Sequence, residues 1–196
     1  MKKMPCVFVR DFDARPAIIT AKVTLGCEWV IAGEGEATRK WDGTASMIQA
    51  GQIYARYDCK RGKAPPPSAI PCDPEPDPVT GHWPHWILVA AQPEYRWHKE
   101  ALDQWTRWWN GPPADGTYEV IGPKIGGNPE NQPEHLLRRH GDEGYIALNG
   151  SRTQEIIATF LAENIIEGLV FHHPDGRMAK IRRGDFGLPW PVRGEP

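Results

Sequence analysis

The sequence lacks the features of disulfide-stabilised, secreted and membrane-spanning proteins. Its four cysteines form no CxxC pair, which argues against a zinc site or a disulfide framework and favours a reducing compartment. The apolar stretch after Met-Lys-Lys is interrupted at Arg10 and Asp11 and is too short for a signal peptide. No segment approaches the length of a membrane span. We therefore expect a cytoplasmic protein with no membrane partner.

The sequence also lacks two common nucleotide-binding motifs and any large excess of charge. Residues 122–128 are rich in glycine but contain no Gly-Lys-Ser/Thr phosphate loop, and no dinucleotide fingerprint occurs. A net charge of −2 gives no general attraction to nucleic acid. A polyanionic partner would have to meet local basic clusters, which occur at residues 60–63, 138–140 and 180–183. Short basic clusters of this kind more often form a solvated surface.

What the sequence does contain is the composition of one globular domain spanning residues 1–196. Apolar residues make up 40% of the chain and charged residues 24%, which is ordinary for a folded protein. Strand patterns occur at residues 28–32 and 46–55, and Asp42-Gly43-Thr44 between them is typical of a tight turn. Lys40 is therefore predicted to lie where a strand enters a hairpin turn.

Helices and strands are interspersed through the rest of the chain without βαβ regularity. We expect helices at residues 95–109, 133–140 and 151–164, the last opened by the capping box Ser151-x-x-Gln154. Tryptophans at helical spacing in the first helix are expected to face the core. We expect strands at residues 118–121, 167–172 and 178–182, and an ordered, proline-rich surface loop at residues 64–84. These elements predict an α+β fold of mainly antiparallel sheets with flanking helices.

Four segments, in order along the chain, carry residues suited to attaching a nucleotide to a lysine. They are Lys40-Trp41-Asp42-Gly43, residues 118–122, residues 166–171 and residues 178–183. A neutral lysine amine can attack the α-phosphate of a nucleoside triphosphate, while lysine, arginine and metal ions neutralise the developing charge. Each segment alone could be structural, but their order on predicted strands favours nucleotidyl transfer.

Further side chains have the chemistry to complete a nucleotide site. Glu167 could hold a hard cation through oxygen, and Glu119 could accept hydrogen bonds from ribose hydroxyls. Arg56 and Lys60 follow the Lys40 turn on the next predicted strand and could bind phosphate. The sequence therefore predicts a site assembled from residues far apart along the chain.

These residues resemble the nucleotidyltransferase superfamily of ATP-dependent ligases and capping enzymes. The similarity is closer to the compact ATP-dependent RNA ligase family that includes the human 5′–3′ RNA ligase. The segments that carry it are Ala55-Arg56, Glu119-x-Ile121-Gly122 with residues 125–129, His140-Gly141, Ile166-Glu167-Gly168, and Lys180-Ile181 with residues 187–191. The resemblance runs from about residue 30 to the C-terminus. It implies a nucleotidyltransferase domain of the ligase adenylation type, unrelated to the ATP-grasp fold.

The resemblance implies an ATP-dependent RNA ligase that works through a lysyl-AMP intermediate. Lys40 would take AMP from ATP, Lys180 would contact the α-phosphate, and Glu167 would bind Mg²⁺ or Mn²⁺. AMP would pass to an RNA 5′-phosphate, and a 3′-hydroxyl would then attack to seal the strand. The remaining contacts to the nucleotide are assigned to Thr38, Arg39, Arg56, Lys60, Glu119 and Arg182.

Two departures from the superfamily pattern bear on this assignment. Arg182 stands where many members have a second lysine, and arginine keeps the charge but cannot act as a neutral acid or base. The chain ends soon after that strand, so we expect no C-terminal oligonucleotide-binding-fold domain of the kind found in DNA ligases and capping enzymes. We expect a monomer acting on RNA ends. Transfer to another acceptor, as in RNA capping or protein AMP transfer, and a non-catalytic RNA-binding module remain alternatives.

Overall fold

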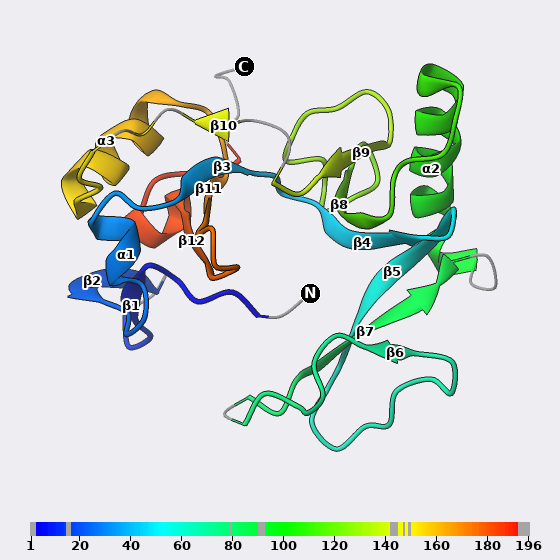
Figure 1. Ribbon diagram of the computed structural model, residues 1–196, viewed down its shortest axis with the longest axis horizontal. Helices are drawn as coiled ribbons and strands as arrows, with labels where there is room; N and C mark the ends of the chain where they lie inside the picture. The colour runs from blue at the N-terminus through cyan, green and yellow to red at the C-terminus, as the bar shows by residue number, and fades with distance from the viewer. Residues whose placement is uncertain are drawn as a thin grey trace. The chain divides into compact units, whose positions relative to one another are not determined.

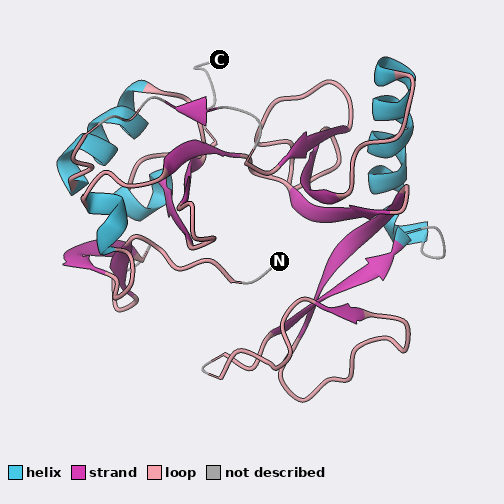
Figure 2. Cartoon of the chain, viewed as in Figure 1, coloured by secondary structure: helices cyan, strands magenta, loops and turns pink. Residues whose placement is uncertain are grey.

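The computed structural model describes residues 3–14, 17–78, 80–89, 93–141, 145–146, 148 and 150–191. The chain forms two compact units (Figure 1). One comprises Met1–Lys3 and Asp42–His140, and the other comprises Met4–Trp41 and Gly141–Pro196. We call them the six-stranded unit and the four-stranded unit after their largest sheets. Strands dominate both, with a few helices (Figure 2), so the expected α+β class with mainly antiparallel pairing is confirmed. The expectation of a single domain stays a prediction.

The six-stranded unit is an antiparallel sheet with helix α2 packed on one face (Figure 1). Its strands lie in the order β6-β7-β5-β4-β8-β9. Because successive strand residues point to opposite faces, Ile48, Ala55 and Tyr118 all meet α2 and form a core with Ala101. The elements of this unit are β4 (Thr44–Gln49), β5 (Gln52–Cys59), β6 (Ile70–Pro71), β7 (Trp83–Leu88), η2 (Pro93–Tyr95), α2 (Arg96–Trp109), β8 (Gly116–Ile121) and β9 (Leu136–Arg139).

The four-stranded unit contains the sheet β10-β3-β11-β12, a separate β1-β2 hairpin and two helices. Its N-terminal segment runs beside β12, where the Val7 N–H donates to the Lys180 carbonyl oxygen at 2.9 Å. Val7, Phe171 and Ile181 are fully buried in its core. The elements of this unit are β1 (Phe8–Asp11), β2 (Ile18–Val23), α1 (Glu28–Ile31), β3 (Glu36–Lys40), β10 (Tyr145–Ile146), α3 (Gln154–Glu163), β11 (Gly168–His172), β12 (Met178–Arg182) and η3 (Arg183–Phe186).

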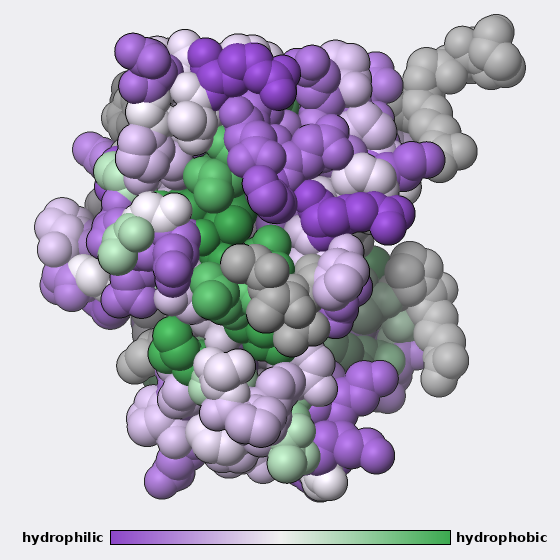
Figure 3. Space-filling view, turned by 90° about the vertical axis from the view of Figure 1, so that its right-hand side faces the viewer, coloured by the Kyte–Doolittle hydropathy of each residue, from purple (hydrophilic) through white to green (hydrophobic). Residues whose placement is uncertain are grey.

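The surface at the right of Figure 1, which Figure 3 turns toward the viewer, belongs to the six-stranded unit. Hydrophobic residues form a band there between hydrophilic side chains (Figure 3).

The face of α2 expected to meet the core does so at Trp97, Ala101 and Trp105, whereas Trp108 is 56% exposed. The stripe is therefore a packing surface for three of its four members.

The strand predicted at residues 28–32 is wrong, because Glu28–Ile31 forms the one-turn helix α1. The Ala32 N–H donates to the Glu28 carbonyl oxygen at 3.0 Å, and Trp29 and Val30 are both buried. A short apolar run has no periodicity that distinguishes a buried strand from a buried helical turn. The strand of this region lies further on, at β3.

The predicted hairpin around Lys40 is also wrong. Lys40 ends β3 and Thr44 begins β4, but these strands belong to different sheets. The single strand predicted at residues 46–55 is two strands, β4 and β5, joined through Ala50 and Gly51. Both turn residues have positive φ, 50° and 72°, as a two-residue hairpin with a mirror-image turn requires. Alanine at the first position hid this turn, since Asn-Gly is the usual signature.

The helix predicted at residues 133–140 is wrong as well, because residues 136–139 form strand β9 at the edge of the six-stranded sheet. Leu136 pairs with Ile121 and Leu137 with Val120. Burying these two leucines against β8 outweighs the local helix signals of a leading proline and a trailing glycine.

The remaining elements agree with the predictions to within a few residues. Helix α2, strand β8 and the β11-β12 hairpin are confirmed. Helix α3 is confirmed, but its N-cap is Thr153, whose side chain accepts the Ile156 N–H, rather than Ser151. The proline-rich segment is a loop that includes the two-residue strand β6. Among the described segments, no helix has the length and apolar character needed to cross a bilayer.

Candidate active site

One face of the four-stranded sheet brings together most of the residues predicted for the chemistry. On β3, Thr38 and Lys40 point to the same face because they are two residues apart. Across β11, Val170 pairs with Thr38 on one side and Lys180 on the other. Gly168 likewise pairs with Lys40 on one side and Arg182 on the other. Thr38, Lys40, Lys180 and Arg182 therefore project from the same face of three adjacent strands.

Lys40 and Glu167 form an ion pair on this face. The Lys40 Nζ donates to Glu167 Oε2, and also to the Trp41 carbonyl oxygen at 3.3 Å. The two side chains are 19% and 9% exposed, so the pair is largely shielded from water. Glu167 immediately precedes β11, and its backbone carbonyl accepts the Arg183 N–H, which fixes the start of that strand. Two residues 127 positions apart are thus held in direct contact.

Lys180 lies in a strongly positive environment. Burial lowers the pKa of its ammonium group, and the nearby charges of Lys40, Arg182 and Arg10 lower it further. The carboxylate of Glu167 acts in the opposite direction. Positively charged neighbours disfavour the charged form of Lys180, and a negatively charged neighbour favours it. Lys180 and Arg182 are two residues apart on β12, on the same face of the sheet as Lys40.

Thr38 is buried beside the same strand and hydrogen-bonded to a histidine. Its Oγ1 lies 3.0 Å from the His172 Nε2, and the Thr38 residue is 3% exposed. His172 is the last residue of β11 and follows Glu167 by five positions in the sequence. Arg39 projects to the opposite face of β3, where its guanidinium stacks 3.9 Å from the centre of the Trp41 ring. The structure therefore brings Thr38 to Lys40 but directs Arg39 away from it.

Asp185 organises a group of residues that the sequence analysis missed in part. It is 1% exposed and accepts hydrogen bonds from Arg10 Nε at 3.0 Å and Arg10 Nη2 at 3.1 Å. Arg182 donates to it from its backbone N–H at 2.9 Å and from Nη2 at 3.2 Å. Burial raises the pKa of the Asp185 carboxyl, but the hydrogen bonds from Arg10 and Arg182 outweigh it, and the pKa is lowered. Arg10 gave no local signal of this role.

Glu119 lies in the six-stranded unit and fixes the turn that follows Lys40 in the sequence. Its Oε1 accepts the Gly43 N–H at 3.1 Å, and its Oε2 lies 3.0 Å from His140 Nε2. A Cβ atom at Gly43 would overlap the Val120 carbonyl oxygen, so only glycine fits there. The Asp42 N–H donates to Glu130 at 2.8 Å. Two carboxylates thus hold the Asp-Gly part of the motif.

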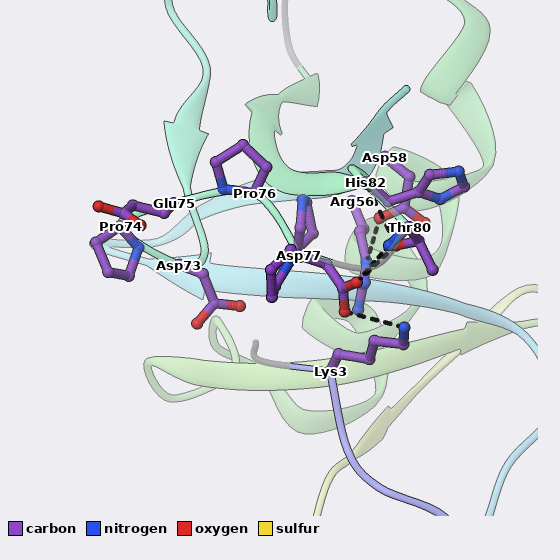
Figure 4. Close-up of a pocket in the computed structure, with 12 residues that line it drawn as sticks. Lys3, Arg56, Asp58, Asp73, Pro74, Glu75, Pro76, Asp77, Thr80 and His82 are labelled. Carbon is purple, nitrogen blue, oxygen red and sulfur yellow. Dashed lines mark hydrogen bonds and ion pairs between the residues drawn. The ribbon is translucent and has the colours of Figure 1, made fainter. Parts of the chain in front are cut away.

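Within the described part of the chain, no hydrogen bond or ion pair joins Arg56 or Lys60 to Glu119. Arg56 donates from Nε to Asp58 at 3.1 Å and lines a pocket of about 570 Å³ (Figure 4). The pocket also contains Lys3, which pairs with Asp77, and further carboxylates from the proline-rich loop (Figure 4). Lys60 is exposed just after β5. This acidic lining is unfavourable to phosphate, so the phosphate roles of Arg56 and Lys60 stay predictions.

Glu167 is the candidate metal ligand at this site. Among the described residues, no three His, Cys, Asp or Glu side chains converge on a point where they could hold an ion. Glu167 supplies a carboxylate beside the reactive lysine. Magnesium is commonly held by one or two carboxylates together with substrate phosphates, and Glu167 fits that role.

Comparison with known proteins supports one family. Residues 114–195 match the model of the family described as RNA ligase 1. The chain is 27% identical to RNA ligase 1 of Mus musculus and of Rattus norvegicus, in each case over 97% of this chain and 82% of the relative. It is 31% identical to RNA ligase 1 of Danio rerio over 57% of this chain and 43% of that relative. The family model and these relatives support the resemblance to RNA ligases that the motifs indicate.

Proposed function

We propose that the protein is an ATP-dependent RNA ligase that acts through a lysyl-AMP intermediate. The observation that carries this proposal is the meeting of Lys40, Glu167 and Lys180 on one face of the four-stranded sheet. The RNA ligase relatives support the reaction class, while the cofactor, the intermediate and the substrate ends are part of the proposal. We further propose that residues 1–196 form a ligase adenylation-type nucleotidyltransferase domain that acts as a monomer in the cytoplasm.

In the first step, the Lys40 amine attacks the α-phosphorus of ATP. An ammonium group has no lone pair, so Lys40 must leave its ion pair with Glu167 and lose a proton before it can attack. Lys180 lies beside Lys40 and would neutralise charge that builds on the α-phosphate oxygens. The products are lysyl-AMP and pyrophosphate.

Other residues of this chain would bind and orient the nucleotide. Glu119 is proposed to accept hydrogen bonds from the ribose, because each carboxylate oxygen has lone pairs beyond those used by Gly43 and His140. The backbone near Thr38 and Arg39, on β3 just before Lys40, is proposed to lie next to the base. Arg56, Lys60 and Arg182 are proposed as phosphate contacts. Mg²⁺ or Mn²⁺ would be held by Glu167 and would supply further neutralisation of phosphate charge.

In the later steps, the AMP group passes from Lys40 to the 5′-phosphate of an RNA. The 3′-hydroxyl of a second RNA end, or of the other end of the same strand, then attacks that phosphate and releases AMP. Both transfers are phosphoryl-type displacements that rely on positioning and on nearby positive charge. Lys180 and Arg182 face the same side as Lys40 and are the groups on hand for this purpose.

A sealing assay with matched nucleic acids tests the proposal. The purified protein is given ATP and Mg²⁺ with single-stranded RNA, nicked RNA or nicked DNA, each bearing a 5′-phosphate and a 3′-hydroxyl. We expect RNA ends to be joined, and we expect Lys40→Arg to abolish joining because arginine keeps the charge but stays protonated. Lys99→Ala removes an exposed lysine of α2 and serves as the control. Preference for DNA, or joining by Lys40→Arg, would contradict the proposal, and use of GTP in place of ATP would correct the cofactor.

A further inference from the structure

The sheet has a bare position between Lys40 and Arg182. Gly168 of β11 pairs with Lys40 of β3 on one side and with Arg182 of β12 on the other. Neighbouring strands are about 4.8 Å apart, so the two backbones are separated by about 10 Å. A Cβ atom at Gly168 would overlap the Ile181 carbonyl oxygen and lie 2.8 Å from the Arg182 Cα, so a side chain is excluded there. No side chain of β11 therefore stands between Lys40 and Arg182 on this face of the sheet.

Arg10 and Arg182 are held side by side at the β12 edge of this sheet. Both bind the same buried carboxylate of Asp185, Arg10 with two nitrogens and Arg182 with Nη2. The two side chains remain 20% and 42% exposed. A guanidinium carries five N–H donors in a rigid plane, so each arginine can bind Asp185 and still offer donors to another anion.

The charges around this pair leave a net positive site. Arg10, Arg182 and Lys180 each carry a positive charge, against the negative charges of Asp185 and of Glu167, the partner of Lys40. One arginine would be enough to balance the charge of Asp185, so the second arginine is an excess positive charge. This excess stands out in a chain whose net charge is −2. An anion of more than one charge is the ligand that such a site favours.

We propose that Arg10 and Arg182, positioned by Asp185, bind the β- and γ-phosphates of ATP and the pyrophosphate that leaves. This inference rests on the proposed function. When the Lys40 nitrogen bonds to the α-phosphorus, the bond from that phosphorus to the bridging oxygen breaks, and pyrophosphate takes the electron pair. The amine proton passes to solvent. The leaving group departs in line, on the side opposite the nucleophile. Arg182 lies across β11 from Lys40, on the same strand as Lys180, and Asp185 holds Arg10 beside it, so the two arginines are placed to receive that group.

Discharge of lysyl-AMP by pyrophosphate can be measured separately from the sealing of adenylated RNA, in which pyrophosphate takes no part. Purified lysyl-AMP protein is treated with increasing pyrophosphate, and the return of ATP is measured. The same protein, free of AMP, is given RNA that already carries AMP on its 5′-phosphate, and sealing is measured. Only the first reaction places pyrophosphate at the site.

We expect Arg10→Gln to raise the pyrophosphate concentration for half-maximal discharge by about 10- to 100-fold, which is the usual effect of losing one charge-assisted hydrogen bond. Sealing of the adenylated RNA should stay at the wild-type rate. Arg10→Lys retains the charge, and should recover part of the loss and remain folded if the glutamine variant does not. Arg177→Gln breaks an arginine–carboxylate pair at the other end of the β11-β12 hairpin and should change neither reaction.

Three outcomes would decide the matter. Discharge of the Arg10 variants at wild-type pyrophosphate concentrations would overturn the inference. Equal loss of discharge and of sealing would also overturn it, because Arg10 would then act only through the fold. Absence of any lysyl-AMP in the wild-type protein would instead overturn the proposed function.

Discussion

Replacing Asp185 with asparagine should weaken the fold measurably, because one buried carboxylate holds two arginines. Asp185 is 1% exposed and accepts four hydrogen bonds of 2.9 to 3.2 Å from Arg10 and Arg182. Removing one partner of a buried ion pair costs about 3–5 kcal/mol. The Arg182 side chain is 42% exposed and contributes little after solvent screening, so we take the lower limit, about 3 kcal/mol. In a protein of this length, that loss lowers Tm by about 6–12 °C.

The pH dependence of this loss provides a second check. The pKa of Asp185 is lowered in the folded protein, so its stabilising effect is complete above the unfolded value of about 3.9. It is lost as the pH falls through the lower folded value. Thermal unfolding followed by circular dichroism should therefore show a constant Tm difference between Asp185→Asn and wild type from neutral pH down to about pH 4. The difference should shrink at lower pH. Asp175→Asn, at an exposed pair, should lower Tm far less. Equal Tm values for Asp185→Asn and wild type at neutral pH would refute the reasoning.

Three other substitutions have expected outcomes. Lys180→Met should abolish lysyl-AMP formation yet raise Tm at pH 7, because a lysine whose pKa is lowered in the folded protein destabilises the fold while it is charged. The gain in Tm should fade as the pH rises toward 10, where the lysine of the unfolded chain also loses its charge. A lower Tm at pH 7 would contradict this expectation. Thr153→Ala removes the N-cap bond to the Ile156 N–H and should cost about 1 kcal/mol, with unchanged lysyl-AMP formation; loss of that activity would contradict a purely structural role. His140→Ala removes the hydrogen-bond partner of the Glu119 carboxylate. It should raise the ATP concentration for half-maximal lysyl-AMP formation several-fold while Tm stays unchanged. An unaltered ATP dependence would remove His140 from the site.

Local signals in the sequence predicted the elements whose structure depends on nearby residues. Helix α2 has a long amphipathic pattern, and the β11-β12 hairpin has alternating residues around a Pro-Asp-Gly turn. Residues 28–32 and 136–139 failed because each is a short apolar run whose form depends on what it packs against. Alternation and propensity cannot supply that information.

The candidate site divides in the same way. The ordered motifs predicted that Lys40, Glu167 and Lys180 act together, and the structure brings these three residues to one face. Arg10 and Asp185 are 175 residues apart and belong to no recognisable motif, so only the fold reveals their pairing. The Thr38–His172 bond, across 134 residues, is of the same kind. Arg39 shows the reverse case, since adjacency to Lys40 in the sequence suggested a role while strand alternation turns it to the other face.

The central claim is that Lys40 carries AMP, and the mass of the intact protein tests it most directly. The protein is incubated with ATP and Mg²⁺, weighed by mass spectrometry, and digested to locate the modified residue. We predict a gain of one AMP group on Lys40, removal of that group by pyrophosphate, and no gain in Lys40→Arg. An unmodified wild-type protein, or AMP attached to any other residue, would contradict the account.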